Sequence, residues 1–239
     1  MVSSFYLVVL IIVLIISFRV IWFLLMLSNV KFLVTKSRRY QNAKKAKKKV
    51  LFIGDSTCVG TGAKPDDSIV GRFGAEYRNW SVHNLGVNGA KLSDVLKQLR
   101  NVKNKKFDFV VILAGNNDVF WFIPLKKSEE SIKKLVGLAK SIGRKVVVMP
   151  AGNPGLAPLF PRPFKWIFTF RTLRLRRVFL SLASKLGFTF VDIYNTRITD
   201  PFSRNPFRYY SSDGVHPSDE GYRVYYESLK KVLIESRIL

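Results

Sequence analysis

One apolar run near the N-terminus restricts what this chain can fold into. From Phe5 to Leu27 the sequence is almost continuously apolar, interrupted by Ser17 and Arg19. As a helix this run would measure about 34 Å, which is enough to cross a bilayer. A secretory signal peptide is the alternative, but it needs a charged segment before its apolar core and a small-residue cleavage site, and the sequence offers neither. The run therefore predicts a transmembrane helix in residues 1–29.

A strongly basic segment follows the apolar run. Residues 30–49 contain nine lysine and arginine residues, and no acidic residue occurs before Asp55. Because basic flanks favour the cytoplasm, this segment predicts a single-pass protein with its N-terminus outside and its C-terminal part cytoplasmic. Residues 30–49 are interpreted as a juxtamembrane linker, whose charges would be attracted to an anionic membrane surface by about 1 kcal/mol each.

Composition narrows the class of the remaining chain. The protein has 239 residues and a formal net charge of +24, yet 48% of its residues are hydrophobic, which excludes a disordered polyelectrolyte. Its length allows one medium domain with a full core. A single cysteine excludes an intramolecular disulfide and a thiolate cluster, and two histidines argue against a multi-histidine metal site.

From residue 50 onward, short β-branched runs alternate with amphipathic stretches. Strands are predicted at residues 50–53, 81–85, 109–113, 146–149 and 188–193, with apolar residues at helical spacing between them. This alternation predicts one α/β domain over residues 50–239, with a five-stranded parallel sheet covered by helices on both faces. Ligands of such sheets bind outside the carboxyl ends of the strands.

Polar residues gather at these predicted strand ends. They form four short segments: Gly54-Asp55-Ser56 after the first strand, residues 84–89 after the second, Gly115-Asn116-Asn117-Asp118 after the third, and Asp213-Gly214-Val215-His216-Pro217 before the last helix.

The four segments contain the parts of a nucleophilic site. A serine hydroxyl is a weak nucleophile unless a base removes its proton, and a carboxylate improves that base by fixing its tautomer. Asp213 and His216 are three residues apart, so the carboxylate can reach one ring nitrogen and leave the other for Ser56. An oxyanion would need converging donors, such as the Ser56 N–H, a glycine N–H and the amide of Asn117.

Together the segments resemble the ordered sequence blocks of the SGNH hydrolases, also called GDSL lipases and esterases. The resemblance covers about residue 50 to the C-terminus and implies a flavodoxin-like, three-layer α/β/α domain that hydrolyses esters without a metal or cofactor. It implies that Ser56 is the nucleophile, that Asp213 and His216 complete the triad, and that Ser56, Asn117 and a glycine form the oxyanion hole.

Two glycines compete for the oxyanion hole. The family spacing after Asn84 favours Gly89 over Gly86. A Gly-x-Ser-x-Gly elbow is missing from the sequence, which disfavours an ordinary α/β-hydrolase.

Other reactive residue types have simpler interpretations. His83 lies within a predicted strand and is expected to be a core histidine rather than the base. Cys58 is expected to be a small buried side chain, and Asp118 is expected to brace the loop of Asn117 by hydrogen bonding.

The segment most informative about substrate is residues 158–180. It interleaves six aromatic or aliphatic residues with six cations: Phe160, Phe164, Trp166, Ile167, Phe168 and Phe170 with Arg162, Lys165, Arg171, Arg174, Arg176 and Arg177. Part of the segment must be core, but apolar anchors beside cations are also typical of an interfacial membrane element. We expect Trp166 and Phe168 to contact a membrane or a lipid substrate. The insert resembles that of lysophospholipase-like members of the family.

These observations favour a membrane-anchored serine esterase whose substrate is a lysophospholipid or another acyl ester. An acetyl esterase acting on a carbohydrate or cell-envelope glycan is the alternative, and it would require the domain to lie outside the cell. A non-enzymatic basic protein that binds nucleic acid or an anionic membrane is a third class. The complete triad argues against it, so no nucleic-acid partner is expected.

Overall fold

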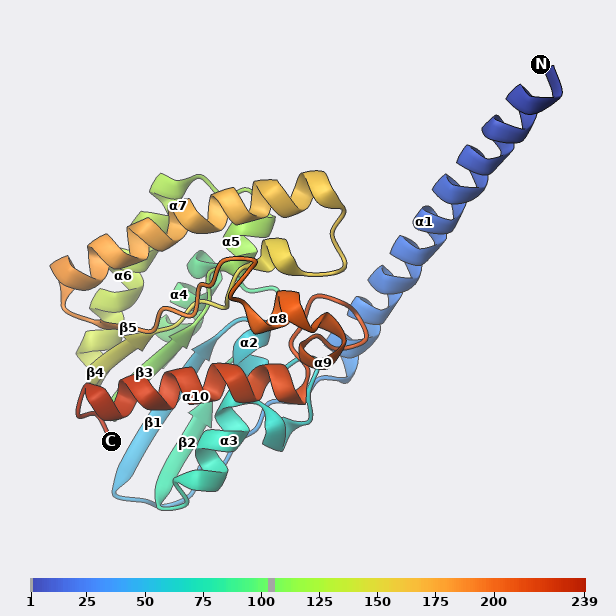
Figure 1. Ribbon diagram of the computed structural model, residues 1–239. Coiled ribbons are helices and arrows are strands. Elements are labelled where there is room, and N and C mark those ends of the chain that lie inside the picture. Colours follow the sequence, from blue (N-terminus) through green and yellow to red (C-terminus); the bar gives the residue numbers. More distant parts are fainter. Residues whose placement is uncertain (1, 103–105) are drawn as a thin grey trace.

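The computed structural model describes residues 2–102 and 106–239. Within these ranges one parallel sheet has the order β2-β1-β3-β4-β5 (Figure 1). Its strands are β1 (Lys48–Gly54), β2 (Trp80–Asn84), β3 (Phe107–Leu113), β4 (Gly143–Val148) and β5 (Thr189–Phe190). The predicted five-stranded parallel sheet is confirmed.

Helices cover both faces of this sheet. Helices α4 (Leu92–Arg100), α6 (Leu125–Ile142) and α7 (Arg162–Leu186) share one core with Leu51 and Ile53 of β1, whereas α3 (Ile69–Glu76) and α10 (Asp219–Glu235) share the other with Val50 and Phe52. Successive strand residues thus point into opposite cores, as the period of two requires. The predicted three-layer α/β/α architecture is confirmed.

Short helices lie at the carboxyl ends of the strands. They are α2 (Ser56–Val59), α5 (Asn116–Phe120), α8 (Pro201–Arg204) and α9 (Pro206–Tyr209), together with the 3-10 turns η1 (Pro65–Asp67) and η2 (Pro154–Leu156). Figure 1 shows α2, α8 and α9 near the end of the sheet that the long N-terminal helix approaches. The fold therefore brings the polar segments of the sequence to one edge.

Strands β4 and β5 differ most from the expected ranges, whereas β1, β2 and β3 begin within two residues of them. The fifth strand was expected to span residues 188–193, but β5 has two residues because only Val147 and Val148 of β4 pair with it. Strand β4 begins at Gly143, three residues earlier than expected, since this residue both ends α6 and pairs with Phe107 of β3.

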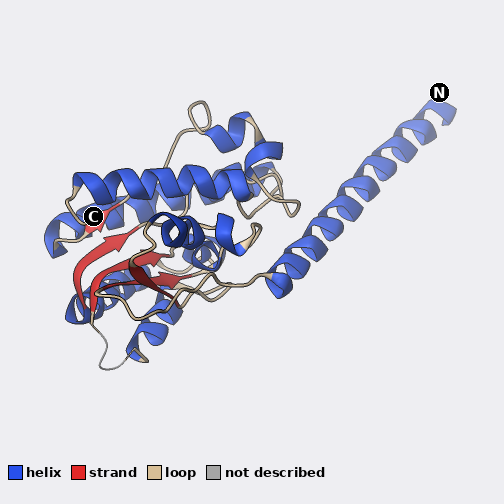
Figure 2. Ribbon diagram, turned by 90° about the horizontal axis from the view of Figure 1, so that it is seen from below, coloured by secondary structure: helices blue, strands red, loops and turns tan. Residues whose placement is uncertain are grey.

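The N-terminal helix is longer than expected. Helix α1 runs from Val2 to Lys36, seven residues beyond the expected end at residue 29, so the first part of the expected linker is helical. The physical reason is that apolar residues continue at helical spacing through Leu33 and Val34. Residues 6–36 are long and apolar enough to cross a membrane, and Figure 2 shows α1 projecting away from the domain.

Candidate active site

Ser56 begins a helix directly after the first strand. Gly54 lies so close to β3 that a Cβ there would be 2.0 Å from the Leu113 carbonyl oxygen, so the position requires glycine. Asp55 is buried and caps α2, its Oδ1 accepting the Thr57 N–H at 2.9 Å. The Ser56 N–H is at the open N-terminal end of α2, where backbone donors have no partner within the helix.

A buried carboxylate orients the histidine. The Oδ2 of Asp213 lies 2.6 Å from Nδ1 of His216, and Asp213 is 0% exposed. Its Oδ1 accepts hydrogen bonds from the Ser211 hydroxyl at 2.8 Å and from the Val215 and His216 N–H groups, both at 2.9 Å. Because the Nδ1–H of a neutral His216 ring donates a hydrogen bond to this carboxylate, Nε2 keeps its lone pair.

The charge of Asp213 is stabilised inside the protein. Burial alone would raise the pKa of this carboxyl, but the hydrogen bond and charge of His216 and the backbone donors together lower it. Asp213 is therefore ionised at neutral pH, and the stability that this ionisation contributes is lost only when the pH falls through the lowered pKa.

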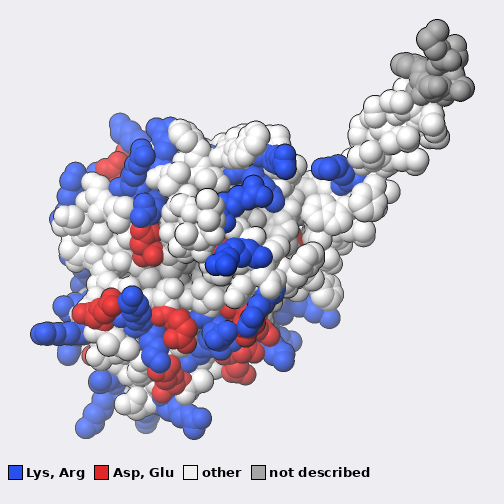
Figure 3. Space-filling view, in the orientation of Figure 1, with Lys and Arg blue, Asp and Glu red and all other residues white. Residues whose placement is uncertain are grey.

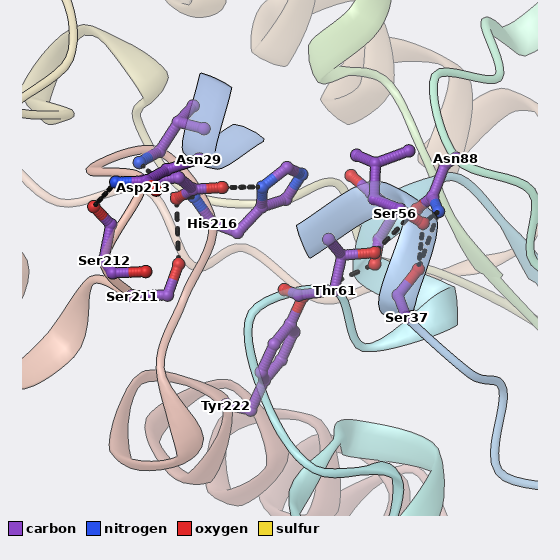
Figure 4. Close-up of polar contacts among 12 residues, drawn as sticks. Asn29, Ser37, Ser56, Thr61, Asn88, Ser211, Ser212, Asp213, His216 and Tyr222 are labelled. Carbon is purple, nitrogen blue, oxygen red and sulfur yellow. Dashed lines mark hydrogen bonds and ion pairs between the residues drawn. The ribbon is translucent and has the colours of Figure 1, made fainter. Parts of the chain in front are cut away.

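The loops of the serine and the histidine are packed together. A Cβ on Gly62, where φ is +98°, would be 3.0 Å from the His216 Cβ. The buried Tyr222 hydroxyl of α10 donates to the Thr61 carbonyl at 2.9 Å and reaches the Ser56 carbonyl at 3.4 Å. Figure 4 shows the His216 ring between Asp213 and Ser56. The structure thus brings the three predicted triad residues to one place.

The two candidate oxyanion glycines have different surroundings. The Gly86 N–H donates to Asn84 Oδ1 at 2.9 Å, and a Cβ on Gly86 would be 2.7 Å from the Val59 nitrogen. Gly89 has φ of +74° and open space where a Cβ would lie. The Gly86 N–H is thus used by a local turn, whereas no contact of Gly89 excludes it from the oxyanion hole.

Asn117 is held at the start of α5. Its Nδ2 donates to the Ala90 carbonyl at 3.0 Å, which leaves one N–H of the amide for a second acceptor. The next residue, Asp118, is buried and accepts from the Leu92 N–H and the Ser128 hydroxyl, both at 2.9 Å. Asp118 therefore ties α5 to α4 and α6, which is the bracing role expected from the sequence.

His83 and Cys58 lie outside this arrangement. His83 is half-buried on β2, with Nε2 at 3.1 Å from the Ser81 hydroxyl and its ring against Phe107. Cys58 is buried, its Sγ donates to Asn84 Oδ1 at 3.2 Å, and burial raises the pKa of the thiol. In the described ranges no group of three or more His, Cys, Asp or Glu side chains is placed to hold a metal ion.

Several supporting residues were not identified from the sequence. Asn88 accepts from the Thr61 hydroxyl at 2.6 Å and donates to Ser37 Oγ at 2.8 Å and to the Val34 carbonyl at 3.2 Å. The Tyr222 hydroxyl, which contacts the carbonyls of Thr61 and Ser56, was not identified either. No local pattern identifies these contacts, because each joins segments that are far apart in the sequence.

Asp55 gives the site a testable electrostatic property. Burial raises the pKa of its carboxyl to about 6, and the hydrogen bonds from Thr57 and the charge of His216 offset this only in part. The folded protein therefore binds the Asp55 proton more tightly than the unfolded chain does. Its contribution to stability is full below about pH 4 and is lost as the pH rises through about 6.

We expect Asp55→Asn, which keeps a capping oxygen but removes the charge, to increase the free energy of unfolding at pH 7.5 by roughly 1–3 kcal/mol and to have little effect at pH 4. Urea denaturation of the full chain in detergent at both pH values measures this. Asp66→Asn, at an exposed position, removes the same charge and serves as the control. A less stable Asp55→Asn protein at pH 7.5 would contradict the argument.

Comparison with known proteins identifies the family of this chain. A model of the GDSL-like lipase/acylhydrolase family matches residues 52–224. No curated protein matches the chain.

Several solved structures share the fold. A lipolytic G-D-S-L family protein from Veillonella parvula is 17% identical, with a TM-score of 0.62 over 78% of this chain and 98% of that one. A lipase/acylhydrolase from Enterococcus faecalis is 23% identical, with a TM-score of 0.58 over 78% and 95%. A catalytic mutant of the acetylxylan esterase Axe2 from Geobacillus stearothermophilus is 21% identical, with a TM-score of 0.58 over 80% and 96%. Since the family match spans most of the domain that carries the site, the chain belongs to the GDSL-like lipase/acylhydrolase family and is a carboxylic ester hydrolase.

Proposed function

We propose that the protein is a membrane-anchored serine hydrolase that cleaves a carboxylic ester of a lipid-like substrate, such as a lysophospholipid, with its catalytic domain in the cytoplasm. The observation that carries the chemistry is the buried Asp213 carboxylate on Nδ1 of His216, with the His216 ring between it and Ser56. This pairing supplies the base that a serine nucleophile requires.

The reaction follows from these positions. Ser56 Oγ attacks the ester carbonyl carbon while His216 Nε2 takes its proton. The N–H groups of Ser56 and Gly89 and the Asn117 amide stabilise the oxyanion, and Asp213 stabilises the imidazolium. His216 then protonates the leaving alcohol, which breaks the ester bond and leaves an acyl group on Ser56. A water molecule, activated by His216 in the same way, releases the carboxylic acid.

The surface of α7 supports a lipid substrate. Its N-terminal half exposes Phe164, Trp166, Ile167 and Phe170, with Trp166 69% and Phe170 60% exposed. The expectation for Phe168 was wrong: this ring is only 5% exposed, because it turns inward against Phe120 and Phe160. The remaining exposed rings lie beside cations on the same helix, as in elements that contact a membrane interface.

A basic and apolar cavity adjoins this surface. It has a volume of about 800 Å³ and lies between α7 and residues 194–206. Its lining contains apolar side chains and three cations but no carboxylate: Leu156, Trp166, Phe170, Leu173 and Phe202 with Arg162, Lys165 and Arg197. Burial, together with Arg197 and Arg162, lowers the pKa of Lys165. An anionic amphiphile would match both the charge and the apolar walls of this cavity.

The cavity lies close to the triad loop. Pro158 lines the cavity, and the adjacent Leu159 N–H donates to the Gly214 carbonyl at 3.1 Å, next to Asp213. A substrate that occupied the cavity would therefore lie beside the loop that carries Asp213 and His216.

Charge supports the proposed anchoring and orientation. Figure 3 shows α1 mostly uncharged and lysine and arginine side chains spread over the visible face of the domain. The basic residues directly after the apolar run favour the cytoplasmic side, and the basic domain would be attracted to anionic lipid there.

The triad assignment predicts strong and specific losses. Ser56→Ala and His216→Ala should each remove nearly all esterase activity while leaving the fold intact, because each removes a partner in the proton transfer. A fluorophosphonate should label the wild type and fail to label Ser56→Ala, as read by in-gel fluorescence. His83→Gln, the matched control, should keep most activity. Labelling that survives Ser56→Ala, or equal losses at both histidines, would contradict the assignment.

Asn117 should act on the transition state rather than on substrate binding. We expect Asn117→Ala to lower kcat by about 10²- to 10³-fold with little change in KM, which is the usual effect of losing one oxyanion donor. Steady-state kinetics with a soluble ester measure this, and the neighbouring Asn116→Ala should have a small effect. A change confined to KM would assign Asn117 to substrate binding instead.

The exposed rings of α7 should matter only for lipid-like substrates. Trp166→Ser combined with Phe170→Ser should slow hydrolysis of long-chain micellar esters far more than that of a soluble acetate ester, because only the former requires interfacial contact. Ile234→Ser, at an exposed position on α10, is the control. Equal losses on both substrates would indicate structural damage. A folded double variant that is unaffected on both would favour the acetyl esterase of a glycan.

A further inference from the structure

The last turns of α1 belong to the catalytic domain. Every side chain from Tyr6 to Leu25 is exposed, but a stripe of half-buried residues follows at helical spacing: Met26, Asn29, Val30, Leu33, Val34 and Ser37. Spacings of three and four residues place these side chains on one face of the helix. The helix is therefore docked on the domain through one face and is not joined to it by a flexible linker alone.

One contact of α1 is with the oxyanion loop. Asn88, which precedes Gly89, donates to Ser37 Oγ at 2.8 Å and to the Val34 carbonyl at 3.2 Å. The Asn88 Oδ1 accepts from Thr61, in the loop that follows the nucleophile, at 2.6 Å (Figure 4). One amide thus joins the end of α1 to two loops of the site.

A second contact is with the triad loop. Asn29 Nδ2 lies 3.5 Å from the carbonyl oxygen of Ser212, the residue before Asp213 (Figure 4). This is a long hydrogen bond, but it lies on the same helix face as the Asn88 contacts. Helix α1 is therefore attached on both sides of the catalytic centre.

These contacts set the distance of the site from the apolar part of α1. Asn29 comes two residues after Leu27, the last residue of the apolar run, which is about 3 Å along the helix, and Ser37 comes about 15 Å after it. The headgroup layer on each side of a bilayer is roughly 5–8 Å thick. When residues 5–27 span the membrane, the triad loop that Asn29 contacts thus lies at the height of the headgroups, and the oxyanion loop that contacts Val34 and Ser37 lies just beyond them on the aqueous side. The ester bonds of glycerolipids lie at the inner edge of that layer.

We propose that α1 is a spacer as well as an anchor: its docked end holds the active site at the headgroup layer, so that esters in the membrane reach Ser56 without leaving the bilayer. This inference rests on the proposed function, and it assigns the source of the substrate to the membrane that contains α1. A simple tether would behave differently, because its length would not determine the height of the site.

The test is a pair of matched insertions in the full chain, reconstituted in phosphatidylcholine/phosphatidylglycerol vesicles. Inserting Ala-Glu-Ala-Lys after Ser28 adds about one helical turn, roughly 6 Å, between the apolar run and the docked residues. Inserting the same residues after Lys45 lengthens the chain beyond the docked segment. Both proteins are assayed on a long-chain p-nitrophenyl ester embedded in the vesicles and on soluble p-nitrophenyl acetate.

We expect the insertion after Ser28 to slow hydrolysis of the embedded ester by at least about tenfold and to leave the acetate rate within about twofold, because only the alignment with the bilayer changes. The insertion after Lys45 should leave both rates within about twofold of the wild type. If the two insertions changed the hydrolysis rate of the embedded ester equally, the proposal that α1 is a spacer would be overturned.

A measurement without substrate separates this inference from the proposed function. A fluorescent phosphonate on Ser56 should transfer energy to headgroup-labelled lipid, and the insertion after Ser28 should reduce the transfer while the insertion after Lys45 does not. If the wild type cleaves the acetate ester but no embedded ester, the proposed lipid substrate is wrong. The energy transfer then still tests whether α1 sets the height of the site. Equal transfer in all three proteins would overturn the spacer even if the lipid substrate is right.

Side-chain variants test the docking itself. Asn29→Ala with Ser37→Ala removes two side chains, on α1 and directly after it, that contact the loops, whereas Ser28→Ala with Thr35→Ala changes exposed residues of α1. The first pair should lower both the energy transfer and the rate on the embedded ester, and the second pair should change neither. If the two double variants gave the same energy transfer and the same rate, the docking of α1 on the domain would be contradicted.

Discussion

The geometry of the site depends on one buried carboxylate. Asp213 is enclosed by protein, and a buried charge is costly unless hydrogen bonds replace its hydration. Four groups do so, from Ser211, Val215 and both the ring and the backbone of His216. These bonds fix the shape of the whole loop. The loop can therefore point Nε2 of His216 toward the serine while its backbone carbonyls accept hydrogen bonds from adjacent segments. A loop stabilised only by apolar contacts would not specify the imidazole tautomer.

The sequence predicted the parts of the site that depend on local signals. Ser56, Asn117 and the Asp213–His216 pair follow strands or precede a helix, and a parallel sheet brings the carboxyl ends of its strands to one edge. Periodicity therefore located the sheet and the polar segments together. The choice between Gly86 and Gly89 was less certain from spacing, since it depends on which N–H the folded loop already uses, and Asn84 accepts that of Gly86.

Contacts between residues that are far apart in the chain could not be predicted from the sequence. Asn88 meets Ser37 across 51 residues, and neither residue has a neighbour pattern that indicates the pairing. The end of α1 was misplaced for a related reason: the basic residues after Leu27 indicated a linker, whereas docking on the domain continues the helix to Lys36. Phe168 was assigned to the surface because aromatics and cations alternate along residues 158–180. Its direction depends on the rings of Phe120 and Phe160, which only the folded structure places beside it.

Two proposed membrane contacts would together define the orientation of the domain. A single helix across a bilayer fixes the height of an attached domain but leaves rotation about the helix axis free. The exposed rings of α7 would provide a second membrane contact under the proposed function, and two contacts would restrict the rotation. The cavity beside α7, with its three cations, would then lie next to the headgroup layer, and its Pro158 wall reaches the triad loop through Leu159 and Gly214. Helix α1 would then set the height of the active site above the bilayer, and α7 would set which side of the domain faces the lipid. An acyl ester in the membrane would reach Ser56 in one orientation.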